Sequence, residues 1–175
     1  NRVQELVEKQ PHLPADIEWH AIGHLQTHKV KYIAPFVNLI HSVDSLKLLQ
    51  EVDKQAKRND RIIDCLLQIK IATEDSKFGL DATAAKTLLA SDEYQALSHV
   101  QVIGLMGMAS FTSDLDQVRL EFRSLKQCFE ALRSEFFEGE DSFKEISMGM
   151  SGDYEIALEE GSTMVRIGSL LFGAR

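Results

Sequence analysis

The sequence predicts an α/β protein that is built on a parallel sheet. Apolar runs rich in β-branched residues alternate with segments of helical periodicity along the whole chain. Two of these runs, residues 62–69 and 102–106, are apolar almost without a break, which is typical of strands buried on both faces. Repeated strand–helix units of this length form either a doubly wound sheet or a TIM-type barrel. Periodicity alone does not decide between these two folds.

Six strands are expected. They occupy residues 17–25, 39–43, 61–69, 100–108, 145–148 and 164–167. A TIM-type barrel has eight strands, and a helix at residues 2–10 precedes the first of these six. In a barrel, at least one further strand would therefore lie upstream of this chain. A six-stranded doubly wound sheet fits the same count.

Two helices between the strands carry clear signals. Ser45 or Asp44 is placed to cap a helix whose apolar residues share one face and which ends near Asn59. Residues 81–90 are rich in Ala and Leu, which are strong helix formers.

The longest helix is expected after Asp114. Apolar residues follow at spacings of three and four as far as Phe136, which is the narrow stripe of a helix that packs on a sheet. Four charged residues of this segment are expected to face water: Arg119, Glu121, Arg123 and Lys126.

The composition is that of a globular protein. Of the 175 residues, 44% are hydrophobic and 26% are charged, and no low-complexity linker interrupts them, so we expect one domain over residues 1–175. The formal net charge of −8 argues against a nucleic-acid partner, which would require a basic surface. No apolar run approaches the ~20 residues of a membrane-spanning helix, so no membrane partner is expected.

The start of the chain and its cysteines add two expectations. The sequence begins at Asn1 in what reads as a helix, without Met or a signal peptide, so we expect it to start inside a longer natural protein. Cys65 and Cys128 lie in apolar periodic segments far apart, which predicts two buried, reduced thiols and a cytoplasmic location.

The last quarter of the chain carries the clearest functional signal. One apolar run ends in SMGMS at residues 147–151, and the next ends in VRIGS at residues 165–169. Backbone N–H groups freed by Gly and Ser at the start of a helix suit a phosphate. Arg166 stands beside this segment and keeps its charge at any physiological pH. Together they predict a phosphorylated small-molecule ligand.

Four segments then resemble one family. They are WHAIGHLQ at residues 19–26, IHSVDS at 40–45, GLMGMA at 104–109 and the whole block 147–175. The chain resembles the pyridoxal phosphate homeostasis proteins of the YggS/PROSC type, which are related to the N-terminal barrel of alanine racemase. The resemblance covers essentially the whole chain. It implies a (β/α)8 barrel that holds pyridoxal 5′-phosphate (PLP) at the carboxyl ends of its strands, with the first two strands absent from this chain.

The resemblance also places the lysine that bonds PLP outside this chain. The family holds PLP as a Schiff base on a lysine of the first strand, in a segment like AVSK. Its second strand ends in a motif like FGEN, whose last residue matches Asn1. We therefore expect the Schiff-base lysine upstream of residue 1 and assign no catalytic residue within the chain.

The same resemblance assigns the cofactor-binding residues. Arg166 would face the pyridine nitrogen of PLP and keep it unprotonated, which makes the ring a poorer electron sink. Gly168 and Ser169 look like phosphate ligands at the start of the last helix. Ser147 and Met148 resemble a second arm of the phosphate pocket.

Further candidates are weaker. Ser151 follows the same strand and would equally suit a helix N-cap. Asn1 matches a polar residue that approaches the PLP ring in the family. Lys77 lies in a loop after a strand, where barrels bind ligands, but a solvated loop lysine explains it equally well. Asp44 suits either a pocket group or a helix cap.

Three histidines recur every four residues, at His20, His24 and His28. On a helix this spacing would invite a metal, but the segment reads as a strand that ends in a turn at Gly23, so the rings would not converge. We therefore expect no metal site. His24 remains a candidate to line the ligand pocket.

The resemblance implies a PLP-binding protein of intracellular PLP homeostasis that holds the cofactor and delivers it to PLP-dependent apo-enzymes. Such a protein is regulatory rather than an enzyme, and we expect a monomer or a weak dimer. The alternative is a PLP-dependent amino-acid racemase, which needs a second acid/base on the opposite ring face, usually supplied by a second domain. The chain shows no such domain before its end at Arg175. A third reading is a barrel enzyme that acts on a phosphorylated metabolite.

Overall fold

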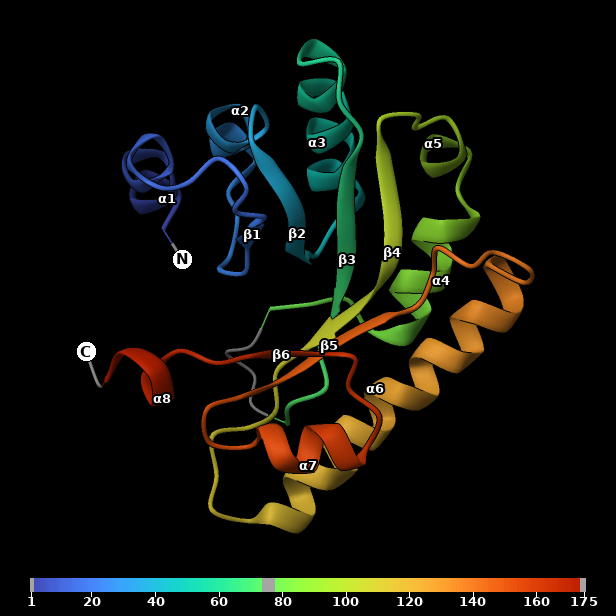
Figure 1. Ribbon diagram of the computed structural model, residues 1–175. Helices are drawn as coiled ribbons and strands as arrows, with labels where there is room; N and C mark the ends of the chain where they lie inside the picture. Colours follow the sequence, from blue (N-terminus) through green and yellow to red (C-terminus); the bar gives the residue numbers. More distant parts are fainter. Residues whose placement is uncertain (1, 74–77, 174–175) are drawn as a thin grey trace.

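Six parallel strands form one curled sheet. The computed structural model describes residues 2–73 and 78–173. The strands follow one another across the sheet in chain order, β1 to β6, and every neighbouring pair is parallel. A doubly wound sheet would reverse its strand order part-way, so the sequential order confirms the barrel-type fold (Figure 1). The strands are Trp19–Ala21 (β1), Val37–Val43 (β2), Ile63–Ile69 (β3), Val100–Gly107 (β4), Glu145–Met150 (β5) and Met164–Arg166 (β6).

All six predicted strands are confirmed, although the first is much shorter than expected. β1 has three residues. Beyond it the chain turns, and the carbonyl of Gly23 accepts a hydrogen bond from the Ser42 hydroxyl at 2.8 Å instead of joining the β-ladder. The apolar residues after this turn pack into the core without forming a strand, as Leu25 does.

Helices surround the convex side of the sheet (Figure 1). In the view of Figure 1 both ends of the chain fall on the left, on the side of the edge strands β1 and β6. Within the described ranges, no helix has both the length and the apolar character needed to cross a membrane. The helices are α1 (Val3–Lys9), η1 (Gln10–His12), η2 (Thr27–Lys29), α2 (Val30–Ile33), α3 (Leu46–Arg58), α4 (Ala82–Ala90), α5 (Asp92–Gln95), α6 (Leu115–Phe136), α7 (Tyr154–Glu159) and α8 (Ser169–Phe172).

Side-chain caps begin two long helices, and the cap predicted at Ser45 is confirmed. The Ser45 hydroxyl accepts a hydrogen bond from the backbone N–H of Leu48 at the start of α3. The Asp114 carboxylate accepts from the first turn of α6. Helices α2, α5 and α7 were not predicted, because helices of four to six residues are too short to show a period.

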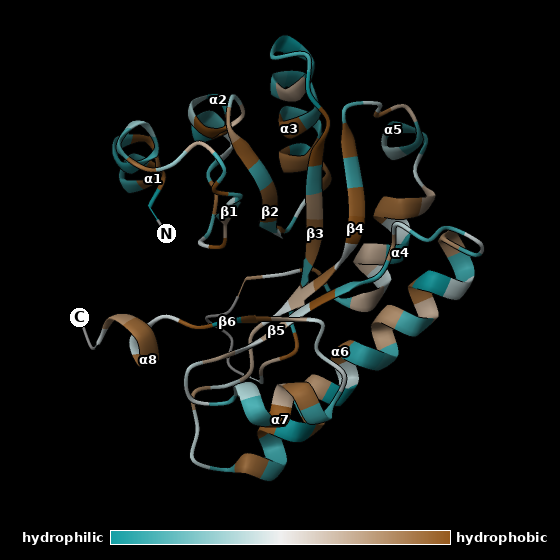
Figure 2. Cartoon of the chain, viewed as in Figure 1, coloured by the Kyte–Doolittle hydropathy of each residue, from teal (hydrophilic) through white to brown (hydrophobic). Residues whose placement is uncertain are grey.

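The core has two parts, one on each face of the sheet. Side chains alternate along β3, so Ile63, Cys65 and Leu67 join the large core under the helices, while Leu66 points to the opposite, inner face. Figure 2 shows the apolar strands at the centre and α6 banded by polar and apolar residues. On the inner face a smaller apolar cluster forms around Leu39, Leu66 and Met106.

A bulge in β4 brings its backbone very close to β5. The register between β3 and β4 shifts beside Cys65, and Gly104 has a φ of +156°. A Cβ at Gly104 would lie 1.8 Å from the Glu145 carbonyl oxygen. Only glycine therefore fits where β4 meets β5.

We expect Gly104→Ala to lower the free energy of unfolding by about 3 kcal/mol or more, because the added methyl group meets backbone as well as an unfavourable φ. Urea denaturation followed by circular dichroism measures the loss. The control is Gly139→Ala, where φ is +81° but nothing lies within 4 Å. That variant should lose only about 1–2 kcal/mol. Equal losses in the two variants would contradict the packing argument.

Candidate functional site

A pocket of about 520 Å³ lies at the carboxyl ends of the strands. In barrels this end of the sheet carries the ligand, because the loops that follow the strands meet there. The loops after β1, β4, β5 and β6 all contribute to this pocket. Its lining residues are Ile22, Phe111, Met150, Ser151, Gly152, Arg166, Ile167, Gly168 and Ser169. Three of the predicted site residues, Arg166, Gly168 and Ser169, thus come together.

Arg166 ends β6 and is held in one orientation by two hydrogen bonds. Its Nη1 donates to the Ser147 hydroxyl at 2.8 Å, and its Nη2 donates to the Gly107 carbonyl at 3.0 Å. Burial lowers the pKa of Arg166 to about 10, against the opposing effect of the Asp153 carboxylate. The guanidinium is therefore still a cation at neutral pH.

The Nε of Arg166 is a buried donor without a partner. It is the one buried side-chain nitrogen or oxygen in residues 2–73 and 78–173 that lacks a hydrogen bond. Leaving such a group unsatisfied costs about 1–3 kcal/mol. A ligand that brings an acceptor, such as an aromatic ring nitrogen, to Arg166 would remove this cost.

Ser147 lies on the inner face of β5, at 0% exposure, and points away from solvent. Besides Arg166, its hydroxyl contacts His41 of β2, whose Nδ1 is 2.9 Å from Ser147 Oγ. His41 Nε2 lies 3.2 Å from Nδ1 of His20 on β1. Burial, with the positive charge of Arg166 and the nearby His20, lowers the pKa of His41 to about 3, so His41 is neutral.

Sequence reasoning did not identify His41 as a site residue. A usable signal was present, since His41 shares the face of Leu39 in the alternation of β2 and therefore points to the inner side of the sheet.

The part of the pocket at the start of α8 is organised by Ser151. Its hydroxyl oxygen accepts from the backbone N–H of Gly168 at 3.2 Å and of Leu170 at 3.5 Å. Ser151 therefore joins the loop after β5 to the start of α8. It is not a helix cap, because Asp153 holds the N-cap position of α7. The hydroxyl and the exposed backbone of Gly168 and Ser169 line the same pocket.

The side chain of Met148 points away from this pocket. It is fully buried in the core under the helices, and its carbonyl accepts a hydrogen bond from the Ser162 hydroxyl at 2.8 Å. Met148 can therefore serve a ligand only through its backbone or by supporting the loop that follows it.

His24 does not line the pocket. His24 stacks on Phe78, with ring centroids 4.4 Å apart, and its Nδ1 lies 3.5 Å from the Asp44 carboxylate. Asn1 and Lys77 lie outside the described residues. No group of three or more His, Cys, Asp or Glu residues suited to a metal is found among residues 2–73 and 78–173.

The expectation that Glu121 faces water is wrong. Glu121 is 6% exposed and its carboxylate accepts hydrogen bonds from the Ser110 backbone at 2.6 Å, the Ser110 hydroxyl at 2.7 Å and the Thr73 backbone at 3.3 Å. Burial by itself would raise the pKa of Glu121, but these hydrogen bonds and one from Gln117 lower it below its ordinary value of 4.5. Glu121 thus ties the loops after β3 and β4 to α6, next to Phe111 of the pocket.

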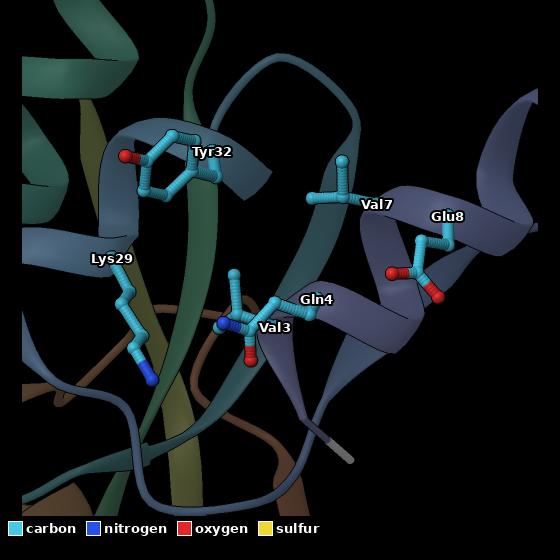
Figure 3. A pocket seen from close by; sticks show the side chains of 6 residues that line it. All are labelled: Val3, Gln4, Val7, Glu8, Lys29 and Tyr32. Atoms are coloured by element: carbon cyan, nitrogen blue, oxygen red, sulfur yellow. The ribbon is translucent and has the colours of Figure 1, made fainter.

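A second pocket, of about 290 Å³, lies between α1 and the η2–α2 segment (Figure 3). It contains none of the predicted site residues. The lining residues are Val3, Gln4, Val7, Glu8, Lys29 and Tyr32.

Comparison with known proteins places the chain in a family. The model of the alanine racemase N-terminal domain matches residues 1–175. A pyridoxal phosphate homeostasis protein of Aquifex aeolicus is 42% identical over 177 residues, which cover all of this chain and 75% of that protein. The chain belongs to the pyridoxal phosphate homeostasis protein family.

Solved structures agree with this assignment. PipY of Synechococcus elongatus, solved without PLP, is 32% identical and superimposes with a TM-score of 0.90 over 99% of this chain and 80% of that one. The same protein with PLP bound gives a TM-score of 0.86 over 99% and 79%. Alanine racemase of Clostridium difficile, at 14% identity and a TM-score of 0.74, covers 99% of this chain and 44% of its own and shows the shared fold alone.

We expect Glu121→Gln to lower the free energy of unfolding at neutral pH by about 1.5–3 kcal/mol, the value of hydrogen bonds to a charged acceptor. Because the folded state lowers the pKa of Glu121, its contribution is present above pH 4.5 and is lost as the pH falls through the lower folded value. The difference between wild type and variant, measured by urea denaturation, should therefore shrink in acid.

The matched control is Glu130→Gln on the same helix, where an exposed carboxylate pairs with Lys126. It should change the stability by less than about 0.5 kcal/mol. A Glu121→Gln difference that stays constant down to the lowest accessible pH would contradict the assigned role.

Proposed function

We propose that this protein binds PLP and serves in PLP homeostasis by holding the cofactor and delivering it. The observation that carries this proposal is the buried, unpartnered Nε of Arg166, a residue that lines the 520 Å³ pocket. A pyridine nitrogen is an acceptor that would complete this donor. Membership of the family, whose relatives are named pyridoxal phosphate homeostasis proteins, and the structure of PipY with PLP bound support the same ligand.

The residues of the pocket divide into a ring end and a phosphate end. Arg166 holds the ring end, and Ser147 acts through Arg166 rather than on the ligand. Gly168, Ser169 and Ser151 form the phosphate end, where the hydroxyls of Ser151 and Ser169 and the backbone N–H of Ser169 offer donors to an anion, while the N–H of Gly168 is held by Ser151. Met148 supports this end from the core. Asn1, His24 and Lys77 remain sequence predictions.

The charge of Arg166 favours binding of PLP over catalysis by PLP. PLP supplies an electron sink for amino-acid chemistry when its ring nitrogen is protonated. Arg166 donates a hydrogen bond but gives up no proton near neutral pH, so the ring nitrogen beside it stays unprotonated. This arrangement fits a carrier or regulatory protein.

The proposal includes partners and a location. The recipients are PLP-dependent apo-enzymes, because a reactive aldehyde is best passed directly to the protein that uses it. We place the protein in the cytoplasm, where its free cysteines Cys65 and Cys128 stay reduced. We further propose that it is a monomer or a weak dimer.

We expect Arg166→Ala to weaken PLP binding by the complete natural polypeptide without unfolding it. A hydrogen bond from a charged donor contributes about 1.5–3 kcal/mol, so the affinity should fall roughly 10- to 150-fold. Visible absorbance titration measures the affinity, and a thermal melt checks the fold. Arg133→Ala is the control, since Arg133 is exposed on α6 and lines no part of the 520 Å³ pocket. Wild-type affinity in Arg166→Ala would refute the assignment.

We expect the PLP-loaded protein to activate a PLP-dependent apo-aminotransferase directly. The rate of activation should then exceed the rate at which the loaded protein releases PLP into solution. Release is measured as the rate at which PLP reaches a carbonyl trap in the absence of the acceptor enzyme. Activation is then followed in the presence of the same trap. Activation that never exceeds the release rate would show that PLP passes through solution and that direct delivery fails.

A further inference from the structure

A chain of three close contacts connects Arg166 to His20 across the inner face of the sheet. Arg166 Nη1 is 2.8 Å from Ser147 Oγ, Ser147 Oγ is 2.9 Å from His41 Nδ1, and His41 Nε2 is 3.2 Å from His20 Nδ1. The two central residues are sealed from solvent, with Ser147 0% and His41 1% exposed. The protons on Ser147 and His41 must therefore find their acceptors within the protein.

The direction of the chain follows from the chemistry of its ends. A guanidinium only donates, so the Ser147 oxygen must accept from Arg166. The Ser147 hydroxyl then has one proton of its own to place, and Nδ1 of His41 is the neighbour that can accept it. A neutral His41 that accepts at Nδ1 carries its proton on Nε2, which donates to Nδ1 of His20.

The opposite arrangement leaves a buried proton unpaired. If His41 carried its proton on Nδ1, Ser147 would accept from both sides and its own proton would have no acceptor among its neighbours in the described residues. A protonated His41 would have the same defect and would add a second cation beside Arg166. Burial, the nearby His20 on β1 and the positive charge of Arg166 on β6 oppose this cation and lower the pKa of His41 to about 3.

We propose that His41 is a positioning residue for Arg166. Its Nδ1 accepts the hydrogen bond of the Ser147 hydroxyl, and this orients a lone pair of the Ser147 oxygen toward the guanidinium. With Nη1 fixed by Ser147 and Nη2 fixed by the Gly107 carbonyl, the plane of the guanidinium is set and Nε keeps one direction. This inference rests on the proposed function, in which Arg166 faces bound PLP.

The proton assignment is tested first in the complete natural polypeptide without PLP. Nitrogen-15 NMR of labelled histidine distinguishes the two neutral tautomers, and His41→Asn and His20→Asn variants identify the two signals. We expect both His41 and His20 to be neutral with the proton on Nε2. A proton on Nδ1 of His41, or a charged His41 at neutral pH, would overturn the inference.

The effect on the ligand is tested with two matched variants of His41. His41→Phe keeps a ring but removes the acceptor, and the affinity for PLP should fall about 5- to 30-fold, as expected for one lost hydrogen bond. His41→Asn places its carbonyl oxygen where Nδ1 stood and should recover most of the affinity, to within about threefold of wild type. An unchanged affinity in His41→Phe would overturn the inference.

A double-mutant cycle separates positioning from general structural support. In a Ser147→Ala background His41 has no hydroxyl to orient, so adding His41→Phe should change the PLP affinity less than about twofold. Losses that simply add would show that His41 acts by packing alone, and the inference would fail. If the wild-type protein itself bound no PLP, the proposed function would fail instead, while the histidine spectrum of the unloaded protein would still decide the proton assignment.

Discussion

The contact between His41 and Ser147 is the constraint around which the inner face of this molecule is arranged. The two residues belong to β2 and β5, which are separated in the sheet by β3 and β4. In a flat sheet, strands three places apart lie roughly 14 Å from each other. A hydrogen-bond distance of 2.9 Å across this gap requires a strongly curled sheet. The same curl brings the loops after β1, β4, β5 and β6 to one pocket.

The inner face of the curled sheet carries an apolar cluster and a polar cluster side by side. Leu39, Leu66 and Met106 form the apolar cluster. Ser147, whose register partner on β4 is Met106, and Arg166 place hydrogen-bonding groups beside this hydrocarbon. Buried polar groups are stable only when they are paired. The chain pairs all but one of those described, and the exception is Nε of Arg166, a residue that lines the pocket.

Structural support for the pocket comes from the outer side as well. Glu121 of α6 holds the loop after β4 through Ser110, one residue before Phe111, which is 98% exposed at the pocket. Ser151 performs the corresponding task between the loop after β5 and the start of α8. Both devices restrain loops that carry the ligand-facing groups, and a restrained pocket loses less entropy when a ligand binds. This agrees with a protein that holds a cofactor.

The sequence by itself determined the strands, the cap of α3 and the segment that lines the pocket after β6, because those signals are local. Each of them is read within a few positions: the apolar runs of the strands, Ser45 before α3 and the VRIGS segment around Arg166. Only the tertiary structure decided the roles of His41 and Glu121. His41 meets Ser147 across 106 positions of sequence, and Glu121 looked like one more charged residue on a solvated helix face. Their partners arrive only when the sheet curls and the loops close over α6, and no local pattern encodes a contact whose two halves are brought together by the fold.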